Sequence, residues 1–296
     1  MNDSFILVAI ILLALLIKMV SKRFFPRYEL FDVFTTALTN VIYYFLVPMA
    51  FIYTFSTRSL AQTDILIVAS FVAYITVAGL SFKYASRGWR DDMRNAVLLT
   101  ALFPNAVFLG FPVSLALFGD VKIASILGLA TLSLNVLVPD FIALKKISLL
   151  KILKLPALVG FLIGVLLNQL GDPGAIVSGI LWWSPKTLSY LATFVLGLNL
   201  QLDGVAYGVV KKPLLVTIFY RFIIAPLVVV FFSLSVGFTQ SESIQLAVVS
   251  GMPPAVLNTL MASKYGWRPD LVAYITFILT IPTVLALPII GTLTIH

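Results

Sequence analysis

The chain has 296 residues, of which 60% are hydrophobic and 11% charged, and it carries a formal net charge of +8. This composition excludes a soluble globular domain and predicts a membrane protein with many helical spans. The absence of cysteine excludes disulfides, thiolate metal sites and a cysteine nucleophile. The single histidine, His296, is the last residue, which argues against a histidine-based metal site or proton relay.

Ten apolar windows of membrane-spanning length follow one another along the chain. They cover residues 5–20, 30–55, 65–84, 95–118, 123–144, 156–170, 176–202, 213–236, 243–265 and 271–295. The first is interpreted as a membrane helix and not as a cleaved signal, because Asp3 precedes it and basic residues follow it. The seventh has Trp182, Trp183 and Pro185 near its start, so its first part is expected to lie along the membrane surface. The predicted fold class is an all-α polytopic membrane protein with ten transmembrane helices.

The basic residues lie mostly in alternate loops between these windows. The odd loops hold sixteen: Lys18, Lys22, Arg23 and Arg27; Lys83, Arg87, Arg90 and Arg94; Lys145, Lys146, Lys151 and Lys154; Lys211 and Lys212; Lys264 and Arg268. The even loops hold three, Arg58, Lys122 and Lys186. Because cytoplasmic loops carry the excess of Lys and Arg, we expect the odd loops to be cytoplasmic and both termini to be extracytoplasmic. The net charge then reports topology in the cell membrane, and nucleic-acid binding is not expected.

Helix-breaking residues interrupt two of the windows, at 101–119 (ALFPNAVFLGFPVSLALFG) and 250–266 (SGMPPAVLNTLMASKYG). An offset of 149 residues aligns the two stretches and places Pro104 over Pro253. Proline removes a backbone hydrogen bond and the membrane interior offers no water to replace it, so each helix is expected to break. The predicted break and crossover residues are Pro104, Gly110, Pro112, Gly251, Pro253 and Pro254. Paired interrupted segments in two halves of a chain indicate the binding site of a transporter.

The same offset relates further windows, since it carries residues 65–84 onto 214–233. The predicted organisation is a first five-helix repeat at 1–145, a short basic cytoplasmic loop at 146–155 and a second five-helix repeat at 156–296. Because five is an odd number, the second unit enters the membrane from the opposite side, and the two repeats are inverted. The alternative is that the halves look alike only because membrane helices share a composition.

Asn105 and Asn258 lie on the two breaks and are the first candidates for binding a substrate. An unpaired amide in hydrocarbon costs on the order of several kcal/mol, so each must have a partner or face water. The N-terminus of a half-helix carries roughly half a positive charge, which attracts a carboxylate. The pattern therefore favours an anion bound by both asparagines and by the freed backbone. The alternative is that the asparagines only bridge backbone groups freed by the prolines.

Asn135 and Arg221 are further candidates for contact with the substrate. Asn135 lies near the middle of its window, where packing against another helix is an equal alternative. Arg221 lies eight positions past Pro213, or about 12 Å along a helix axis. It therefore serves as a cation for the substrate or extends to the cytoplasmic surface. Packing or interfacial roles are expected for Asn40, Asn199 and Asp140.

Five motifs resemble the auxin efflux carrier family, which includes plant auxin exporters and prokaryotic carriers of malate and malonate. They are LTNVIYYFLVP (38–48), FPNAVFLGFP (103–112), LPALVGFLIG (155–164), LGLNL (196–200) and MPPAVLNTLMASKYG (252–266). The resemblance implies the fold of the bile-acid/sodium symporters, with helices four and nine crossing at broken midpoints. It also implies a transport unit of helices three, four, five, eight, nine and ten against a scaffold of the other four. The sequence departs from the family pattern at Leu155, where asparagine is usual, and it lacks the long cytoplasmic loop of the plant exporters.

The residues and this resemblance together predict a secondary transporter that moves a small organic anion by alternating access. The anion would be a carboxylate such as malate, malonate or an auxin-like acid; a sodium-coupled symporter of the bile-acid type and a channel are the alternatives. Catalysis is not expected, because the chain lacks histidine ligands, a paired intramembrane aspartate and a serine with an evident base. No cofactor is predicted, and no Na⁺ or H⁺ coupling site is assigned, so uncoupled transport stays open. The expected partners are the anion and the lipid bilayer, and a homodimer stays open.

Overall fold

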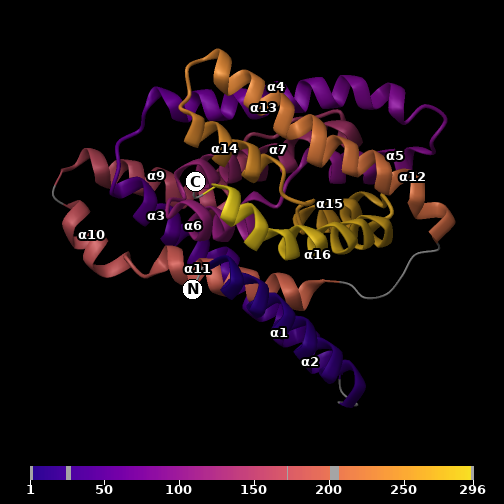
Figure 1. Ribbon diagram of the computed structural model, residues 1–296, viewed down its shortest axis with the longest axis horizontal. Helices are drawn as coiled ribbons and strands as arrows, with labels where there is room; N and C mark the ends of the chain where they lie inside the picture. The colour runs from indigo at the N-terminus through magenta and orange to yellow at the C-terminus, as the bar shows by residue number, and fades with distance from the viewer. Residues whose placement is uncertain (1–2, 25–27, 172, 201–206, 295–296) are drawn as a thin grey trace.

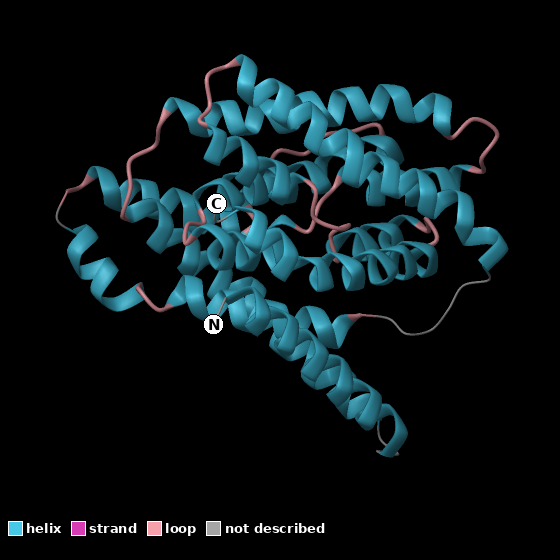
Figure 2. Ribbon diagram, in the orientation of Figure 1, coloured by secondary structure: helices cyan, strands magenta, loops and turns pink. Residues whose placement is uncertain are grey.

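A computed structural model describes residues 3–24, 28–171, 173–200 and 207–294 of the chain (Figure 1). Helices make up 85% of the structure, and the described part contains no β-strand, as Figure 2 shows. The all-α fold class predicted from composition is therefore confirmed. It follows from the apolar runs, because a chain in lipid must satisfy its backbone hydrogen bonds within each segment.

Six helices among the described residues are long and apolar enough to cross a membrane. Four are single helices: α1 (Asp3–Phe24), α4 (Gln62–Ala85), α7 (Lys122–Leu144) and α16 (Pro269–Thr294). Two are composite spans that contain a π-helical segment. The span Leu30–Ser56 combines α2 (Tyr28–Val41), η1 (Ile42–Leu46) and α3 (Val47–Ser56), and the span Val209–Ser235 combines α12 (Tyr207–Ile218), η3 (Phe219–Ile224) and α13 (Ala225–Ser235). The chain is therefore a multi-pass membrane protein.

The other predicted windows form shorter or interrupted helices. They are α5 (Asp91–Leu102) with η2 (Ala106–Gly110) and α6 (Phe111–Phe118), α9 (Pro156–Gln169), α10 (Pro173–Leu181) with α11 (Ser184–Asn199), and α14 (Gln240–Ser250) with α15 (Leu257–Tyr265). A short helix, α8 (Leu150–Leu153), lies in the predicted linker. None of these helices reaches 18 residues, so helix length and composition identify six candidate spans among the described residues, and the ten spans stay a prediction.

The break in the first stretch is narrower than the sequence pattern predicts. α5 ends at Leu102 and helical backbone resumes at Ala106, because Pro104 has no N–H to offer a helix. Gly110 and Pro112, predicted as part of the break, lie in continuous helical backbone. The wide π-turn of η2 immediately precedes Pro112, and a π-turn is one way in which a helix accommodates a local irregularity. In the second stretch, Gly251, Pro253 and Pro254 all lie between α14 and α15.

The two breaks lie in the interior, since residues 103–105 and 252–255 are all buried. In Figure 1, α4 and α13 run along one side of the molecule, and α1 and α2 lie along the opposite side. α3 packs against α9, α1 against α11, and α13 against both α4 and α14. Glycine permits the closest of these contacts: a Cβ at Gly160 in α9 would lie 2.5 Å from the carbonyl oxygen of Pro48 in α3. Such small residues are a common device for packing helices in a membrane.

A Gly160→Ala substitution tests the contact between α3 and α9. The added methyl group meets backbone atoms that cannot rotate away, so we expect a loss of stability of about 1–3 kcal/mol. Gly79→Ala in α4 is the matched control, because a Cβ at Gly79 has no heavy atom within 4 Å. The control should be neutral or stabilising by about 0.5–1 kcal/mol. Thermal unfolding of both purified variants measures the difference, and equal stability would contradict the packing.

Candidate functional site

The two breaks meet in the interior of the protein and satisfy part of each other's backbone. Pro104 and Pro254 form an isolated antiparallel bridge. The Asn105 N–H donates to the Pro253 carbonyl oxygen at 2.8 Å, and the Ala255 N–H donates to the Phe103 carbonyl oxygen at 3.0 Å. An offset of 150 residues exchanges these two bonds with each other, which is one residue more than the offset predicted from the sequence. The two breaks together are called the crossing.

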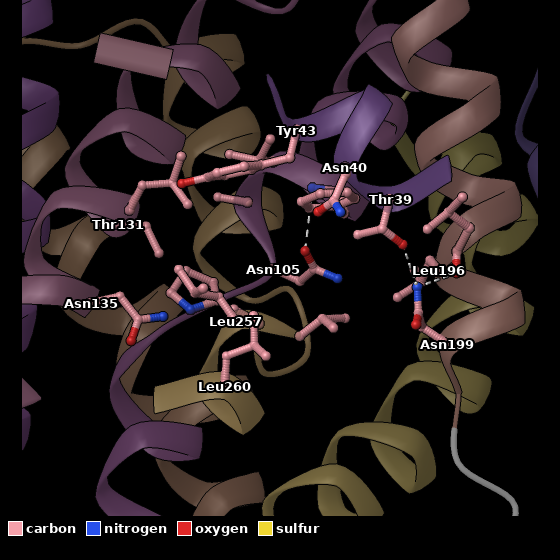
Figure 3. A pocket seen from close by; sticks show the side chains of 18 of the residues that line it. Thr39, Asn40, Tyr43, Asn105, Thr131, Asn135, Leu196, Asn199, Leu257 and Leu260 are labelled. Atoms are coloured by element: carbon pink, nitrogen blue, oxygen red, sulfur yellow. Dashed lines mark hydrogen bonds between the residues drawn. The ribbon is translucent and has the colours of Figure 1, made fainter. Parts of the chain in front are cut away.

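A cavity of about 310 Å³ lies beside the crossing (Figure 3). Its lining consists of Thr39, Asn40, Tyr43, Tyr44, Pro104, Asn105, Ala106, Val107, Phe108, Thr131, Leu132, Asn135, Val195, Leu196, Asn199, Ala255, Val256, Leu257 and Leu260. This lining, drawn from the described part of the chain, contains no charged side chain. Amide, hydroxyl and backbone groups are therefore its polar features.

The N-terminal ends of two half-helices contribute to the cavity wall. Ala106, Val107 and Phe108 begin the helical run that continues through α6, and Val256 and Leu257 are the N-cap and first residue of α15. The first N–H groups of a helix have no partner within that helix and carry partial positive charge. An uncharged cavity that two such ends approach is electrostatically suited to an anion.

Asn105 is the N-cap of the first of these half-helices. Its side-chain oxygen accepts a hydrogen bond from the Phe108 N–H at 3.3 Å, and its carbonyl oxygen accepts from the N–H groups of Leu109 and Gly110. The side chain is 2% exposed, and its Nδ2 has no hydrogen-bond partner among the described residues. Figure 3 shows Asn105 in the wall of the cavity, between Asn135 on one side and Asn199 on the other. Asn105 thus leaves a buried donor unpaired.

The side chains of Asn135 and Asn258 are hydrogen-bonded to each other, and Asn258 also binds the backbone of the first break. The Asn258 Nδ2 donates to the Phe103 carbonyl oxygen at 3.2 Å, and its Oδ1 accepts from the Asn135 Nδ2 at 2.8 Å. Both side chains are fully buried. Asn135 lines the cavity whereas Asn258 does not. Asn105 and Asn258, the two asparagines predicted at the crossing, therefore both hydrogen-bond to backbone groups near the first break, and of these two only Asn105 lines the cavity.

Arg221 lies in η3 and binds the other ends of the broken helices. Its guanidinium donates to the carbonyl oxygens of Ala101 (3.2 Å), Leu102 (3.3 Å), Met252 (3.2 Å) and Ser250, and to the Tyr74 hydroxyl (3.2 Å). Arg221 is fully buried and does not line the cavity. The expected alternative of reaching the cytoplasmic surface is therefore wrong. Since α5 and α14 end at these carbonyls, one cation complements the negative ends of both helix dipoles.

Other polar residues that line the cavity were expected from the sequence to have packing roles, or were not predicted to contact a substrate. Thr39 and Asn40 come from α2, Tyr43 from η1 and Asn199 from α11. The Asn199 Nδ2 donates to the Thr39 hydroxyl at 3.1 Å and to the Val195 carbonyl oxygen at 3.1 Å. For Asn40 and Asn199 the sequence signal is an amide in an apolar window, which does not reveal which windows face each other, and Thr39 and Tyr43 carry no such signal.

Asp140, at the end of α7, joins three neighbours. Its carboxylate forms an ion pair with Lys264 at 3.1 Å, a second with Lys151, and accepts a hydrogen bond from the Tyr265 hydroxyl. It thereby links α15 to the short helix α8, in agreement with the structural role expected for it. No group of three or more His, Cys, Asp or Glu side chains that could hold a metal occurs in the described residues.

An all-helical membrane protein with two interrupted helices that meet beside a cavity has the architecture of a membrane transporter. A model of the membrane transport protein family matches residues 138–291, just over half of the chain. The chain therefore belongs to this family, the auxin efflux carrier family. This assignment confirms the resemblance seen in the sequence motifs.

Two archaeal relatives extend the similarity beyond the region that the family model matches. An uncharacterized transporter of Methanocaldococcus jannaschii is 23% identical over 274 residues, which cover 86% of this chain and 88% of the relative. An uncharacterized transporter of Methanothermobacter thermautotrophicus is 25% identical over 223 residues, which cover 72% of this chain and 73% of the relative. The family and these names indicate a role in transport and not in catalysis.

Replacement of Arg221 tests whether this residue holds the crossing together. Arg221→Met leaves buried carbonyl oxygens of two helix ends without a donor, so we expect a loss of about 3–5 kcal/mol of stability or failure to fold. Arg221→Lys keeps the charge but loses the planar fork, and its stability should be intermediate. The exposed Arg87→Met is the control. Thermal unfolding in detergent compares the variants, and an Arg221→Met protein as stable as the control would contradict the capping role.

Proposed function

We propose that the protein is a secondary carrier of a small organic anion and that the anion binds in the cavity at the crossing. The observation that carries this proposal is the approach of two half-helix N-termini and the unpaired Asn105 amide to a cavity without charged side chains. Carboxylates suit such a site, because N–H groups and helix dipoles stabilise negative charge. Malate, malonate and auxin-like acids are the carboxylates that the family resemblance suggests.

The proposed residue roles follow from their positions. Asn105 would contact the carboxylate directly, Asn135 would contact the substrate from α7, and Asn258 would act through Asn135, to which it is hydrogen-bonded. Arg221 would act at a distance, because its donors are used by backbone carbonyls and it does not line the cavity. Its charge then contributes to the positive potential at the crossing and fixes the geometry of the two breaks.

The proposed architecture is ten spans in two inverted five-helix repeats, residues 1–145 and 156–296, joined by the loop at 146–155. Helix breaks at corresponding points of both halves support it, as does the pair of backbone bonds that an offset of 150 residues exchanges. The cavity lies between α2, η1 and α11 on one side and η2, α7 and α15 on the other. These are elements of the scaffold and of the transport unit that the family resemblance implies, so relative movement of the two units would alternate access to the site.

Uptake into liposomes tests the proposed function. Purified protein should take up labelled small carboxylates in a saturable manner and show counter-exchange. Asn105→Ala should reduce the uptake rate about tenfold or more, because a donor to the anion is lost. Asn168→Ala is the matched control, since Asn168 donates to the Ser56 carbonyl oxygen away from the cavity.

The alternatives give different results in the same assay. Uptake that requires an imposed sodium gradient would favour a sodium-coupled symporter, and flux that stays linear with concentration would favour a channel. Full activity of Asn105→Ala in folded protein would remove this residue from the site. Absence of saturable uptake for every carboxylate, under sodium, proton and voltage gradients, would contradict the proposed function.

Single cysteines test the proposed orientation, with both termini and the even loops extracytoplasmic. The native chain has no cysteine, so Thr57→Cys in loop two and Lys146→Cys in loop five introduce unique labels. A membrane-impermeant maleimide added to intact cells should label Thr57→Cys and should label Lys146→Cys only after permeabilisation. The reverse pattern would contradict the topology.

A further inference from the structure

The linker between α7 and α9 exposes apolar side chains at the end of the span that α7 forms. Residues 145–154 of this linker read KKISLLKILK, so apolar residues alternate with lysines. Four of the apolar side chains are 56–70% exposed: Ile147, Leu149, Leu150 and Leu153. Such a surface is unfavourable in water, whereas the boundary between lipid headgroups and acyl chains accommodates it. The linker, with α8 inside it, is therefore expected to lie on the membrane surface.

Three lysines of the linker have no partner in the described part of the chain. Lys145, Lys146 and Lys154 are exposed, and their side chains form no ion pair or hydrogen bond there. The fourth lysine, Lys151, is paired with Asp140 at the end of α7. That pair holds α8 against α7, so the three unpaired cations are kept near one place on the protein. Clustered lysines at a membrane surface attract anionic lipid headgroups.

An apolar groove of about 650 Å³ begins at the same linker. Ile152 of α8 lies in its wall, and α4, α7 and α9 supply the rest. Most of these residues are apolar, among them Ile65, Val68, Val72, Leu134, Leu158 and Phe161. The lining residues of α7, from Ile126 to Leu137, cover about 16 Å of helix axis, and half of a hydrocarbon core of about 30 Å is similar. The groove is therefore long enough for an acyl chain of one leaflet.

The two ends of the groove differ in charge. The end away from the linker is the first turn of α4, where Asp64 lines the groove and is paired with Arg58 at 2.9 Å. The start of α7 lies beside it, since the Lys122 Nζ donates to the Thr63 hydroxyl at 3.3 Å and Asp120 accepts from the Lys122 N–H. Two acids balance two bases at that end. The linker end has an excess of unpaired positive charge, so it is the end that suits an anionic headgroup.

We propose that the groove and the linker form a binding site for one anionic phospholipid. An acyl chain would lie in the groove along α4, α7 and α9, and the headgroup phosphate would bind Lys145, Lys146 and Lys154. In the proposed orientation the linker is cytoplasmic, so the lipid would belong to the cytoplasmic leaflet. The site is distinct from the cavity at the crossing, with which the groove shares no lining residue.

The lysines should make the site selective for negative charge. Each lysine near an anionic membrane surface contributes on the order of a fivefold gain in affinity, which salt reduces. We therefore expect phosphatidylglycerol to bind about tenfold or more tightly than phosphatidylcholine with the same acyl chains. The groove contributes equally to both lipids, because it contacts only the chains.

Native mass spectrometry of the purified protein measures this preference. Each of the two lipids is titrated separately into the protein in detergent, and the apparent Kd of the first bound lipid is determined. The two Kd values should come within about threefold of each other in a variant that loses the three linker cations, Lys145→Gln, Lys146→Gln and Lys154→Gln.

A charge-matched variant is the control for attraction by surface charge in general. It removes three exposed cations from other predicted cytoplasmic loops and should keep the preference; its substitutions are Lys83→Gln, Arg87→Gln and Lys211→Gln. None of these three residues lines the groove.

A substitution in the groove wall tests the acyl-chain part of the site. Ser133 of α7 is half-buried and lines the groove. Ser133→Phe adds a ring there and should weaken binding of both lipids about tenfold or more, while Ser133→Ala should bind like the wild type. Phosphatidylglycerol with six-carbon chains tests the same point without a substitution. It keeps the headgroup but cannot fill the groove, so the wild-type protein should bind it about tenfold or more weakly.

Each result supports or overturns a stated part of the proposal. Equal binding of phosphatidylglycerol and phosphatidylcholine by the wild-type protein would overturn it. An equal loss of preference in the linker variant and in its charge-matched control would overturn the role of the linker. Binding that depends neither on Ser133→Phe nor on chain length would remove the groove from the site. Because no measurement here uses transport, failure of this proposal and failure of the proposed function are distinguishable.

Discussion

Inside a bilayer every backbone polar group needs a partner, and the interior of this protein is arranged around the groups that two broken helices release. The breaks satisfy part of this requirement by pairing with each other: Asn105 donates to Pro253, and Ala255 donates to Phe103. Prolines at both breaks lack the N–H group that a continuous helix needs, so neither helix can continue through its break. Two interrupted segments that would each be costly in lipid thus become one stable crossing.

The remaining backbone groups at the breaks are of two kinds, carbonyl oxygens with partial negative charge and N–H groups with partial positive charge. The carbonyl ends of α5 and α14 are covered by the guanidinium of Arg221, which is fully buried and makes contacts to both. The N–H ends of the following half-helices lie at the cavity. The negative helix ends therefore have a resident cation, while the positive ends have a cavity of about 310 Å³ before them. This asymmetry explains how a site without a charged side chain can be suited to an anion.

The sequence predicted the helical segments and both breaks, because apolar length and proline act locally along the chain. It did not predict the extent of the first break, since Pro112 follows a π-turn that no residue pattern distinguishes from a kink. It identified Asn105 and Asn135 from their cost in hydrocarbon, but it assigned Asn40 and Asn199 to packing although both line the cavity. Which spans face each other depends on tertiary packing, which one sequence does not contain.

Protection of a single cysteine in the cavity tests most directly whether an anion binds at the crossing. Leu260→Cys places a thiol in the cavity wall of a chain without native cysteine, and Thr57→Cys places one at a different pocket. The modification rate by a small water-soluble thiol reagent is measured against the concentration of a transported carboxylate. If an anion binds at the crossing, modification should slow in a saturable manner at Leu260→Cys and should not change at Thr57→Cys. An unchanged rate at Leu260→Cys, at concentrations that saturate uptake, would contradict it.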